Sequence, residues 1–251
     1  MDFLQAFVVG TVQGITEWLP ISSEGINSIL LTQIYGTTLA EAILISIWLH
    51  IGTLFAALIY LRKDVIHVLK TRDQTFWFLV VATIASLIVA APLMLITTDF
   101  FLLAGKNAMI LIGILLIITG LMQWKAKKQK SENKKITYKD AIIAGIAQGL
   151  AILPGLSRSG LTISVLLFRR YHPTQSIKLS FLMSIPAIII AGAWASTKTA
   201  ATFSSEGLAA LAASFIFGLI TIAALLKLAE RINFSYFCFL IGVIAIIAGL
   251  V

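Results

Sequence analysis

Three ionisable residues lie inside otherwise apolar stretches of the sequence, and their types indicate what chemistry the chain could perform. Glu17 and Glu24 flank one proline-containing break, and Arg158 lies in a second one. Charged side chains inside a bilayer are costly and are functional by default. Arginine matches phosphate oxygens with two parallel hydrogen bonds, and carboxylates are ligands of divalent cations. These residues therefore indicate a site for a phosphate or diphosphate whose apolar part stays in lipid.

Hydroxyl groups and glycines surround these three charges. The hydroxyl-bearing residues are Ser22, Ser23, Ser157, Ser159 and Thr162, and the glycines that would let a ligand approach the backbone are Gly25 and Gly160. Half-helices that begin near the serines would present free backbone N–H groups and the positive end of the helix dipole to an anion. A structural Glu17–Arg158 pair is the alternative interpretation, but such a pair would not need these hydroxyl groups around it.

Gln13 adds a candidate cation ligand near the first break. It precedes Glu17 by four residues, so both side chains lie on one face of a helix. A diphosphate normally brings a divalent cation, which prefers oxygen ligands. We therefore expect Gln13 and Glu17 to hold Mg²⁺ or Ca²⁺ beside phosphates that Arg158 binds.

The composition predicts an integral membrane protein. Of the 251 residues, 59% are hydrophobic and 12% are charged, and the mean hydropathy is +0.98, whereas soluble domains are roughly 45–50% apolar and roughly 25% charged. About 20 apolar residues cross a bilayer as a helix, and six segments qualify: 41–61, 76–97, 108–124, 179–197, 208–227 and 234–251. We expect one all-α membrane domain over residues 1–251. We attribute the net charge of +8 to the loops, with no nucleic-acid partner.

Two further apolar segments, 3–36 and 140–168, are interrupted at 19–25 and 153–160. Each half has about 12–17 residues, too few to cross a bilayer, so each segment is predicted to form a re-entrant helical hairpin. Gln13-Gly14 precedes the first break as Gln148-Gly149 precedes the second. This similarity predicts an internal repeat, with repeat 1 near 1–124, repeat 2 near 140–251 and a basic loop at 125–139 between them.

The basic residues predict an orientation in the membrane. If loops 62–73 and 125–139 are cytoplasmic, the inner side holds 16 of the 19 Lys and Arg residues, while Lys106 and Lys198 face outside. Such an excess agrees with the positive-inside rule. With six spans, both termini then lie outside. The two hairpins enter from opposite sides, which gives the repeats inverted topology, and their tips can meet near the midplane.

The motifs resemble those of the undecaprenyl-diphosphate phosphatase membrane family of the bacitracin-resistance type. The first motif is Gln13-x-x-x-Glu17 followed by Pro20-Ile21-Ser22-Ser23-Glu24-Gly25, and the second is Pro154-Gly155-Leu156-Ser157-Arg158-Ser159-Gly160-Leu161-Thr162. The resemblance covers nearly the whole chain in hydropathy, repeat layout and motif positions. It implies a metal-dependent plasma-membrane enzyme that removes the terminal phosphate of a polyprenyl diphosphate on the outer face. Such an enzyme recycles the lipid carrier of cell-wall or surface glycan assembly.

The resemblance also implies roles for individual residues. Glu17 would serve the metal, together with Gln13, and the attacking group. Ser23 would be the nucleophile or a phosphate ligand, and Arg158 would neutralise charge in the transition state. The remaining motif residues would bind the substrate: Ser22, Gly25, Gly155, Ser157, Ser159, Gly160 and Thr162. Whether Ser23 or water attacks, and whether the chain forms a homodimer, stays open.

One position departs from the family pattern. The first motif of the family usually ends Ser-Ser-x-Gly-His, but Ile26 occupies the histidine position here. Hydrolysis could still proceed with Glu17 as base or with a metal-bound hydroxide, because phosphoryl transfer depends mainly on positioning and charge neutralisation. We expect His67 and His172 at the cytoplasmic boundary. We interpret His50 as a packed, hydrogen-bonded helix residue, with a cavity-facing position as the alternative.

Other functions are compatible with the same pattern. Paired broken helices in inverted repeats are typical of secondary transporters, so a flippase of polyprenyl phosphate is the main alternative to the enzyme. A non-catalytic membrane scaffold and another phospholipid hydrolase are further alternatives. Only the enzyme would need both Glu17 and a divalent cation.

Overall fold

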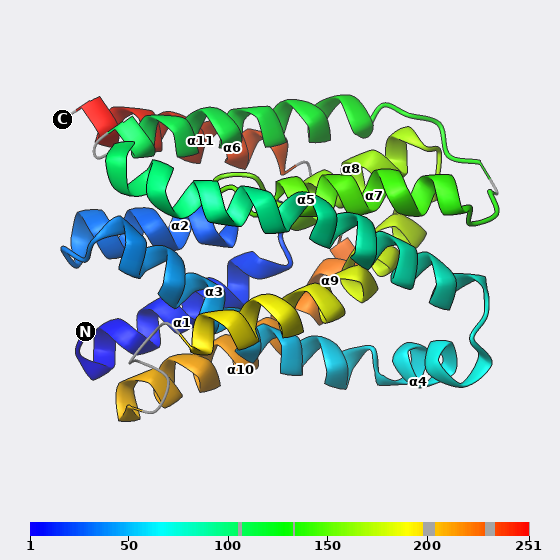
Figure 1. Ribbon diagram of the computed structural model, residues 1–251, viewed down its shortest axis with the longest axis horizontal. Helices are drawn as coiled ribbons and strands as arrows, with labels where there is room; N and C mark the ends of the chain where they lie inside the picture. The colour runs from blue at the N-terminus through cyan, green and yellow to red at the C-terminus, as the bar shows by residue number, and fades with distance from the viewer. Residues whose placement is uncertain (105–106, 133, 198–203, 229–233, 251) are drawn as a thin grey trace.

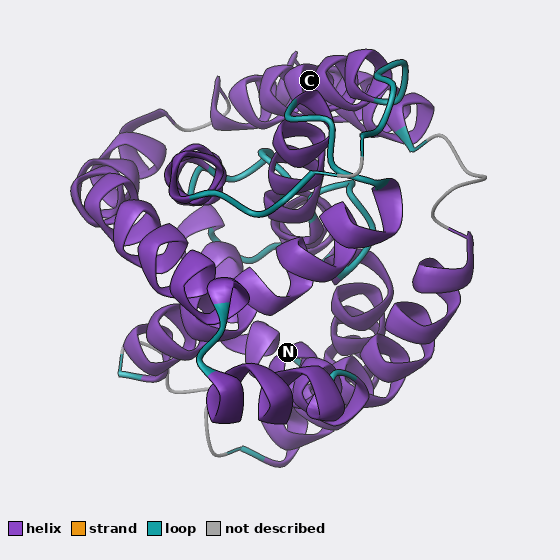
Figure 2. Cartoon of the chain, turned by 90° about the vertical axis from the view of Figure 1, so that its right-hand side faces the viewer, coloured by secondary structure: helices purple, strands orange, loops and turns teal. Residues whose placement is uncertain are grey.

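The computed structural model describes residues 1–250 except 105–106, 133, 198–203 and 229–233 (Figure 1). The described chain contains helices and no strand (Figure 2), so the all-α prediction is confirmed. The helices are α1 (Phe3–Glu17), α2 (Ser23–Ile29), α3 (Leu39–Tyr60), α4 (Arg62–Thr71), α5 (Gln74–Ala104), α6 (Asn107–Ala126), α7 (Tyr138–Leu150), α8 (Arg158–Phe168), α9 (Pro173–Ser196), α10 (Ser205–Leu228) and α11 (Ser235–Leu250), with a π-helical turn η1 (Leu30–Ile34) after α2. Lys106, Lys198 and Arg231 lie outside the described residues.

Five described helices are long and apolar enough to cross a membrane, namely α3, α5, α6, α9 and α10. They confirm five of the six predicted spans, with ends that differ by a few residues. The sixth prediction, 234–251, corresponds to α11, which has 16 residues and is shorter than the other five. Figure 1 places both termini at one end of the helical bundle and α4 with residues 127–132 at the other.

Both predicted interruptions are present. The first separates the end of α1 at Glu17 from the start of α2 at Ser23, and the second separates α7 from the start of α8 at Arg158. The two breaks meet, because a Cβ added to Gly25 would lie 3.5 Å from the Cα of Gly155. The predicted contact between the two breaks is therefore confirmed.

A serine side chain caps the helix that begins after each break. Ser22 has a left-handed backbone (φ 61°), and its hydroxyl oxygen accepts a hydrogen bond from the Gly25 amide at 3.3 Å. Ser157 does the same for the Gly160 amide at 3.1 Å at the start of α8. Such caps satisfy one of the unpaired N–H groups at a helix start.

A pair of glycines in each broken segment lets a short helix approach a long one. In α1, a Cβ on Gly10 or Gly14 would lie 2.1 Å or 2.6 Å from a backbone oxygen of α10. In α7, a Cβ on Gly145 or Gly149 would lie 2.4 Å or 2.6 Å from a backbone oxygen of α5. Each broken segment is therefore pressed against a membrane-spanning helix of the other half of the chain, and any larger side chain would push it away.

A buried carboxylate joins the basic loop to the second broken segment. Asp140, in the first turn of α7, is fully buried and accepts hydrogen bonds from Lys134 Nζ at 2.9 Å, Tyr171 Oη at 2.8 Å and Thr137 Oγ1 at 2.7 Å. It also pairs with Arg169 Nε at 2.5 Å, just after α8. Burial alone would raise the pKa of Asp140, but these donors outweigh it and lower that pKa to about 2.

The lowered pKa of Asp140 predicts a loss of stability in acid. Its pKa in the folded chain lies below the ordinary value, so the stabilisation is complete above about pH 4 and is lost as the pH falls toward 2. A shift of this size corresponds to about 2 kcal/mol at neutral pH. We expect the thermal unfolding midpoint of the wild type to fall as the pH is lowered through this window. The midpoint of Asp140→Asn should be lower than that of the wild type at pH 7 and should change less with pH. The control is Glu132→Gln, which breaks an exposed pair with Arg170 and should matter little. An equal acid response in Asp140→Asn and wild type would contradict the assignment.

Candidate active site

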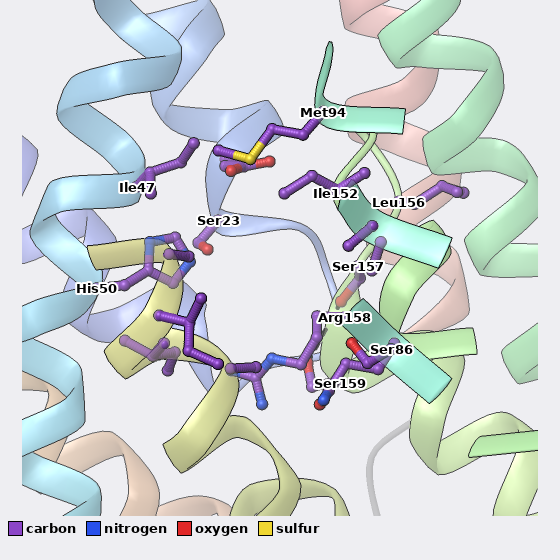
Figure 3. A pocket seen from close by; sticks show the side chains of 18 of the residues that line it. Ser23, Ile47, His50, Ser86, Met94, Ile152, Leu156, Ser157, Arg158 and Ser159 are labelled. Carbon is purple, nitrogen blue, oxygen red and sulfur yellow. Dashed lines mark hydrogen bonds between the residues drawn. The ribbon is translucent and has the colours of Figure 1, made fainter. Parts of the chain in front are cut away.

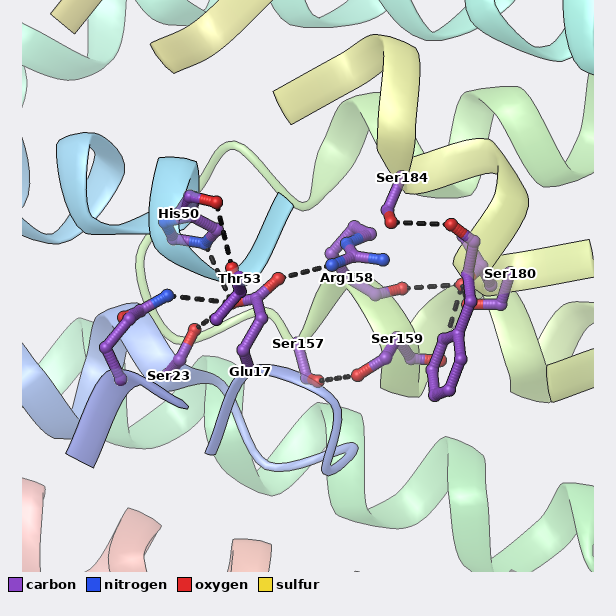
Figure 4. Close-up of polar contacts among 12 residues, drawn as sticks. Glu17, Ser23, His50, Thr53, Ser157, Arg158, Ser159, Ser180 and Ser184 are labelled. Atoms are coloured by element: carbon purple, nitrogen blue, oxygen red, sulfur yellow. Dashed lines mark hydrogen bonds and ion pairs between the residues drawn. The ribbon is translucent and has the colours of Figure 1, made fainter. Parts of the chain in front are cut away.

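Glu17, at the end of α1, is the centre of the polar contacts between the two breaks (Figure 4). Its Oε2 accepts hydrogen bonds from Ser23 Oγ at 2.7 Å and Gln13 Nε2 at 2.9 Å, and it lies 2.9 Å from His50 Nε2. Its Oε1 pairs with Nη2 of Arg158. The Glu17 side chain is only 3% exposed, so these donors replace the water that a carboxylate would otherwise bind.

Arg158, the first residue of α8, has one nitrogen in use and one free. Nη2 contacts Glu17, and the guanidinium carbon lies 5.8 Å from the centroid of the Trp18 ring. Nη1 is buried and has no hydrogen-bond partner in the described part of the chain. A buried unpaired donor costs about 1–3 kcal/mol, and more when it is charged. This atom is therefore positioned to bind an anion that enters the site.

A cavity of about 260 Å³ opens onto this cluster (Figure 3). Its polar end is formed by side chains from α1, α2, α3 and α8 and from the two breaks, namely Glu17, Ser22, Ser23, Glu24, His50, Ser157, Arg158 and Ser159. The remaining wall is mostly apolar and comes mainly from α5, α9 and the second break. The cavity therefore combines an anion-binding end with an apolar wall, which suits an amphiphilic ligand.

The four serines of the two motifs line the cavity. In three of them, Ser22, Ser157 and Ser159, the hydroxyl group bonds to the backbone. Ser22 and Ser157 cap helices, and Ser159 Oγ donates to the Leu19 backbone oxygen at 3.0 Å. Ser23 Oγ donates to Glu17 at 2.7 Å from inside the cavity. Ser23 is therefore the hydroxyl best placed for chemistry, and the other three hold the two breaks in shape.

The remaining predicted substrate-binding residues lie behind the cavity wall in the described structure. Thr162 is fully buried, and its hydroxyl lies 2.7 Å from that of Ser180. A Cβ on Gly155 (φ 101°) would lie 2.5 Å from a backbone oxygen of α6, and one on Gly160 would lie 2.8 Å from an α6 side chain. Gly155 and Gly160 therefore serve close packing between the second break and α6, whereas a Cβ on Gly25 would make only an ordinary contact with α6, at 3.5 Å. The expectation that they admit a ligand to the backbone finds no support in this geometry.

The donor arrangement also bears on the expected divalent cation. The amide nitrogen of Gln13 donates to Glu17, and its amide oxygen accepts a hydrogen bond from Asn27 Nδ2 at 2.7 Å. Gln13 is not among the residues that line the cavity. Glu24 lines the cavity, and its carboxylate forms no hydrogen bond or ion pair with other described residues. Among the described residues, no three His, Cys, Asp or Glu side chains form a ready-made metal site. Mg²⁺ is commonly held by one or two carboxylates plus substrate phosphates, so the site fits a cation that arrives with a diphosphate.

His50 is the residue whose position the sequence did not predict. Its Nδ1 contacts the Ser46 backbone oxygen at 2.6 Å, as expected for a hydrogen-bonded helix residue, but its ring lines the cavity and its Nε2 faces Glu17 at 2.9 Å. His50 is therefore a hydrogen-bonded helix residue, as interpreted, and it also has the cavity-facing position given as the alternative. A sequence signal existed, because His50 is the histidine in the middle of a predicted span, where a polar ring needs a partner.

We expect His50 to position Glu17 by donating to Oε2. His50→Leu should lower kcat about 10–100-fold, because a hydrogen bond to a charged group contributes about 1.5–3 kcal/mol. His50→Gln, which keeps a donor, should recover most of that loss, and His67→Gln on exposed α4 serves as the control. Steady-state kinetics with polyprenyl diphosphate measure these effects. Full activity in His50→Leu would remove His50 from the site's function.

Comparison with known proteins identifies relatives over the whole length. The family model described as bacitracin resistance protein BacA matches residues 6–247. A protein named undecaprenyl-diphosphatase from Methanococcoides burtonii is 40% identical over 98% of this chain and 98% of its own. Proteins of the same name from Methanothrix thermoacetophila and Methanopyrus kandleri are 38% and 36% identical, over 98% and 100% of this chain and 96% and 97% of theirs. With its two motifs meeting at one buried cluster and the family match spanning nearly its full length, the chain belongs to the bacitracin resistance protein BacA family.

Proposed function

We propose that the chain hydrolyses a polyprenyl diphosphate of the undecaprenyl type to the monophosphate and inorganic phosphate, and so recycles a membrane lipid carrier. The observation that carries this proposal is the buried, unpaired Nη1 of Arg158 in a cavity that also holds the Ser23–Glu17 pair. Guanidinium groups bind phosphate oxygens in this way. The near full-length relatives named undecaprenyl-diphosphatase support the same activity.

In the proposed reaction, Ser23 Oγ attacks the terminal phosphorus and its proton passes to Oε2 of Glu17, 2.7 Å away. The bond from that phosphorus to the bridging oxygen breaks, and its electron pair leaves with the lipid monophosphate. Water then attacks the phosphoserine, restores the Ser23 hydroxyl and releases inorganic phosphate. Throughout, Arg158 neutralises negative charge on the transferred group, where phosphoryl-transfer enzymes obtain most of their rate gain.

Glu17 and Glu24, together with the diphosphate oxygens, would hold a divalent cation, Mg²⁺ or Ca²⁺. When bound, such a cation neutralises part of the phosphate charge. Gln13 contacts Glu17 from behind in this arrangement, and its predicted role as a direct ligand stays a prediction.

The finer membrane arrangement is also a proposal. α11 would complete six spans, and α1–α2 and α7–α8 would be re-entrant hairpins of an inverted repeat. The matching glycine pairs of α1 and α7, each pressed against a helix of the other half, support the repeat. Loops 62–73 and 125–139 would be cytoplasmic, with both termini and the cavity mouth outside, because these loops carry most of the basic residues. Homodimer formation stays a prediction.

Phosphate release from C55 polyprenyl diphosphate by the purified protein in detergent tests the proposed activity. We expect release that requires a divalent cation and that Ser23→Ala reduces at least about 100-fold, as removal of an activated nucleophile should. Ser196→Ala, at the far end of α9, is the matched control. A folded wild type that binds polyprenyl phosphate but releases no phosphate would instead favour the flippase.

A further inference from the structure

Two membrane-spanning helices present matching faces to the cavity. From α5 the apolar lining residues are Leu87, Ala90, Ala91 and Met94, beside the polar Ser86, and from α9 the lining residues are Ala187, Ile188, Ile190, Ala191 and Trp194. In both helices the spacing is that of a single helical face. Ala90 and Ala91 lie in the middle of the α5 stripe, and Ala187 and Ala191 lie one helical turn apart in the α9 stripe. At these alanines the two helices leave room that larger side chains would fill.

Some of these residues also face the outside of the molecule. Leu87 is 37% exposed and Ile190 is 44% exposed, and both line the cavity. Ala91 is exposed as well. A residue that borders both the cavity and the surface marks an opening, and this one lies between α5 and α9. Since both helices are apolar spans, the opening faces the hydrocarbon of the bilayer and not water.

The size of the cavity requires such an opening for a long lipid. Its volume is about 260 Å³, below the ~300–1,000 Å³ of pockets that enclose a drug-sized ligand. It can hold a diphosphate bound by Arg158 and a short piece of chain, but the rest of a long chain must lie elsewhere. An isoprenoid chain leaving through an apolar opening would remain in an apolar medium throughout.

We propose that the α5–α9 opening is a binding site for the isoprenoid chain of the substrate, through which the chain passes sideways from the cavity into the bilayer. This inference rests on the proposed phosphatase function. In this arrangement α5 and α9 contact the isoprenoid chain, so that activity depends on its length, while the two breaks bind the diphosphate.

Narrowing the opening should therefore affect long substrates selectively. We expect Ala90→Trp and Ala191→Trp to lower kcat/KM for C55 polyprenyl diphosphate at least about 10-fold, chiefly through KM, because a bulky ring in a packed site displaces the chain. With a five-carbon isoprenoid diphosphate, whose chain does not need the opening, the same variants should lose at least about 3-fold less kcat/KM than they lose with the C55 substrate.

The matched controls are Ile88→Trp and Ile189→Trp, which lie next in sequence on the same helices but are 70% and 50% exposed and do not line the cavity. These control variants should leave kcat/KM unchanged for both substrates. An equal loss for long and short substrates in Ala90→Trp and Ala191→Trp, or no loss for either, would overturn the proposal.

A labelling experiment tests lipid binding in the α5–α9 opening without depending on catalysis. The single native cysteine, Cys238, is fully buried, so a cysteine introduced at Ala91 can be followed with a maleimide. Undecaprenyl phosphate should slow its modification and inorganic diphosphate should not, while a cysteine at Ile88 should respond to neither. Equal rates at Ala91 with and without the lipid would overturn the opening. If the wild type releases no phosphate from either substrate, the proposed function fails. The labelling experiment still decides whether the isoprenoid chain of a lipid phosphate binds in the opening.

Discussion

Replacing Glu17 with glutamine should lower kcat for polyprenyl diphosphate at least about 10³-fold, within the range for loss of a positioned general base. The amide cannot accept the Ser23 proton, and it no longer carries the charge that pairs with Arg158. Binding of polyprenyl phosphate should persist, because the guanidinium remains and gains a free nitrogen. The measurements are phosphate release and equilibrium binding of the monophosphate lipid.

The control for this variant is Glu41→Gln. Glu41 is an exposed carboxylate in the capping box at the start of α3, where glutamine serves equally well. It should leave kcat and binding unchanged. A Glu17→Gln protein that retains a tenth or more of wild-type kcat would exclude Glu17 as the base.

Replacing Arg158 with alanine should lower kcat/KM about 10³–10⁵-fold, the range for an arginine that stabilises a phosphoryl-transfer transition state. Lipid phosphate binding should weaken in parallel, since the unpaired Nη1 is the donor that we assign to the phosphate. Arg158→Lys should recover little, because an ammonium group cannot contact Glu17 and a phosphate with a rigid fork of donors. Kinetics and lipid binding measured on the same preparations test both variants.

The Arg158 variants also separate the functions under comparison. Arg62→Ala, on exposed α4, is the control and should behave as wild type. Wild-type hydrolysis that is lost in Glu17→Gln while lipid binding is retained, together with loss of both hydrolysis and binding in Arg158→Ala, is the pattern expected of an enzyme. If Arg158→Ala hydrolysed and bound normally, the Glu17–Arg158 contact would be the purely structural pair that the sequence also allowed.

Much of the architecture followed from local pattern. Apolar runs near 20 residues long predicted five spans correctly, because a bilayer demands that length. Proline, glycine and serine at the breaks predicted where the helices stop and restart, since those residues cap and turn a chain. The sixth segment is less clear from composition, because α11 is apolar but has only 16 described residues.

Local pattern did not reveal the surroundings of some predicted site residues. Glycines near a charged motif suggested ligand access, yet Gly155 and Gly160 pack against α6. Gln13 shares a helix face with Glu17 as expected, but its oxygen is taken by Asn27 from α2. Neither outcome could be known without the neighbouring helix, because a residue's surroundings depend on which element packs there.

The sequence by itself determined that the chain is a helical membrane protein, that three ionisable residues lie at two breaks in its apolar segments, and that a carboxylate, a hydroxyl and an arginine are the groups available for chemistry. Periodicity and length carry that information, because they act over neighbouring residues. Only the tertiary structure decided that His50 from α3 joins Glu17, that one Arg158 nitrogen has no partner among the described residues, and that α5 and α9 supply much of the apolar wall of the cavity. Those features depend on contacts between residues far apart in the chain, which packing of whole helices alone establishes.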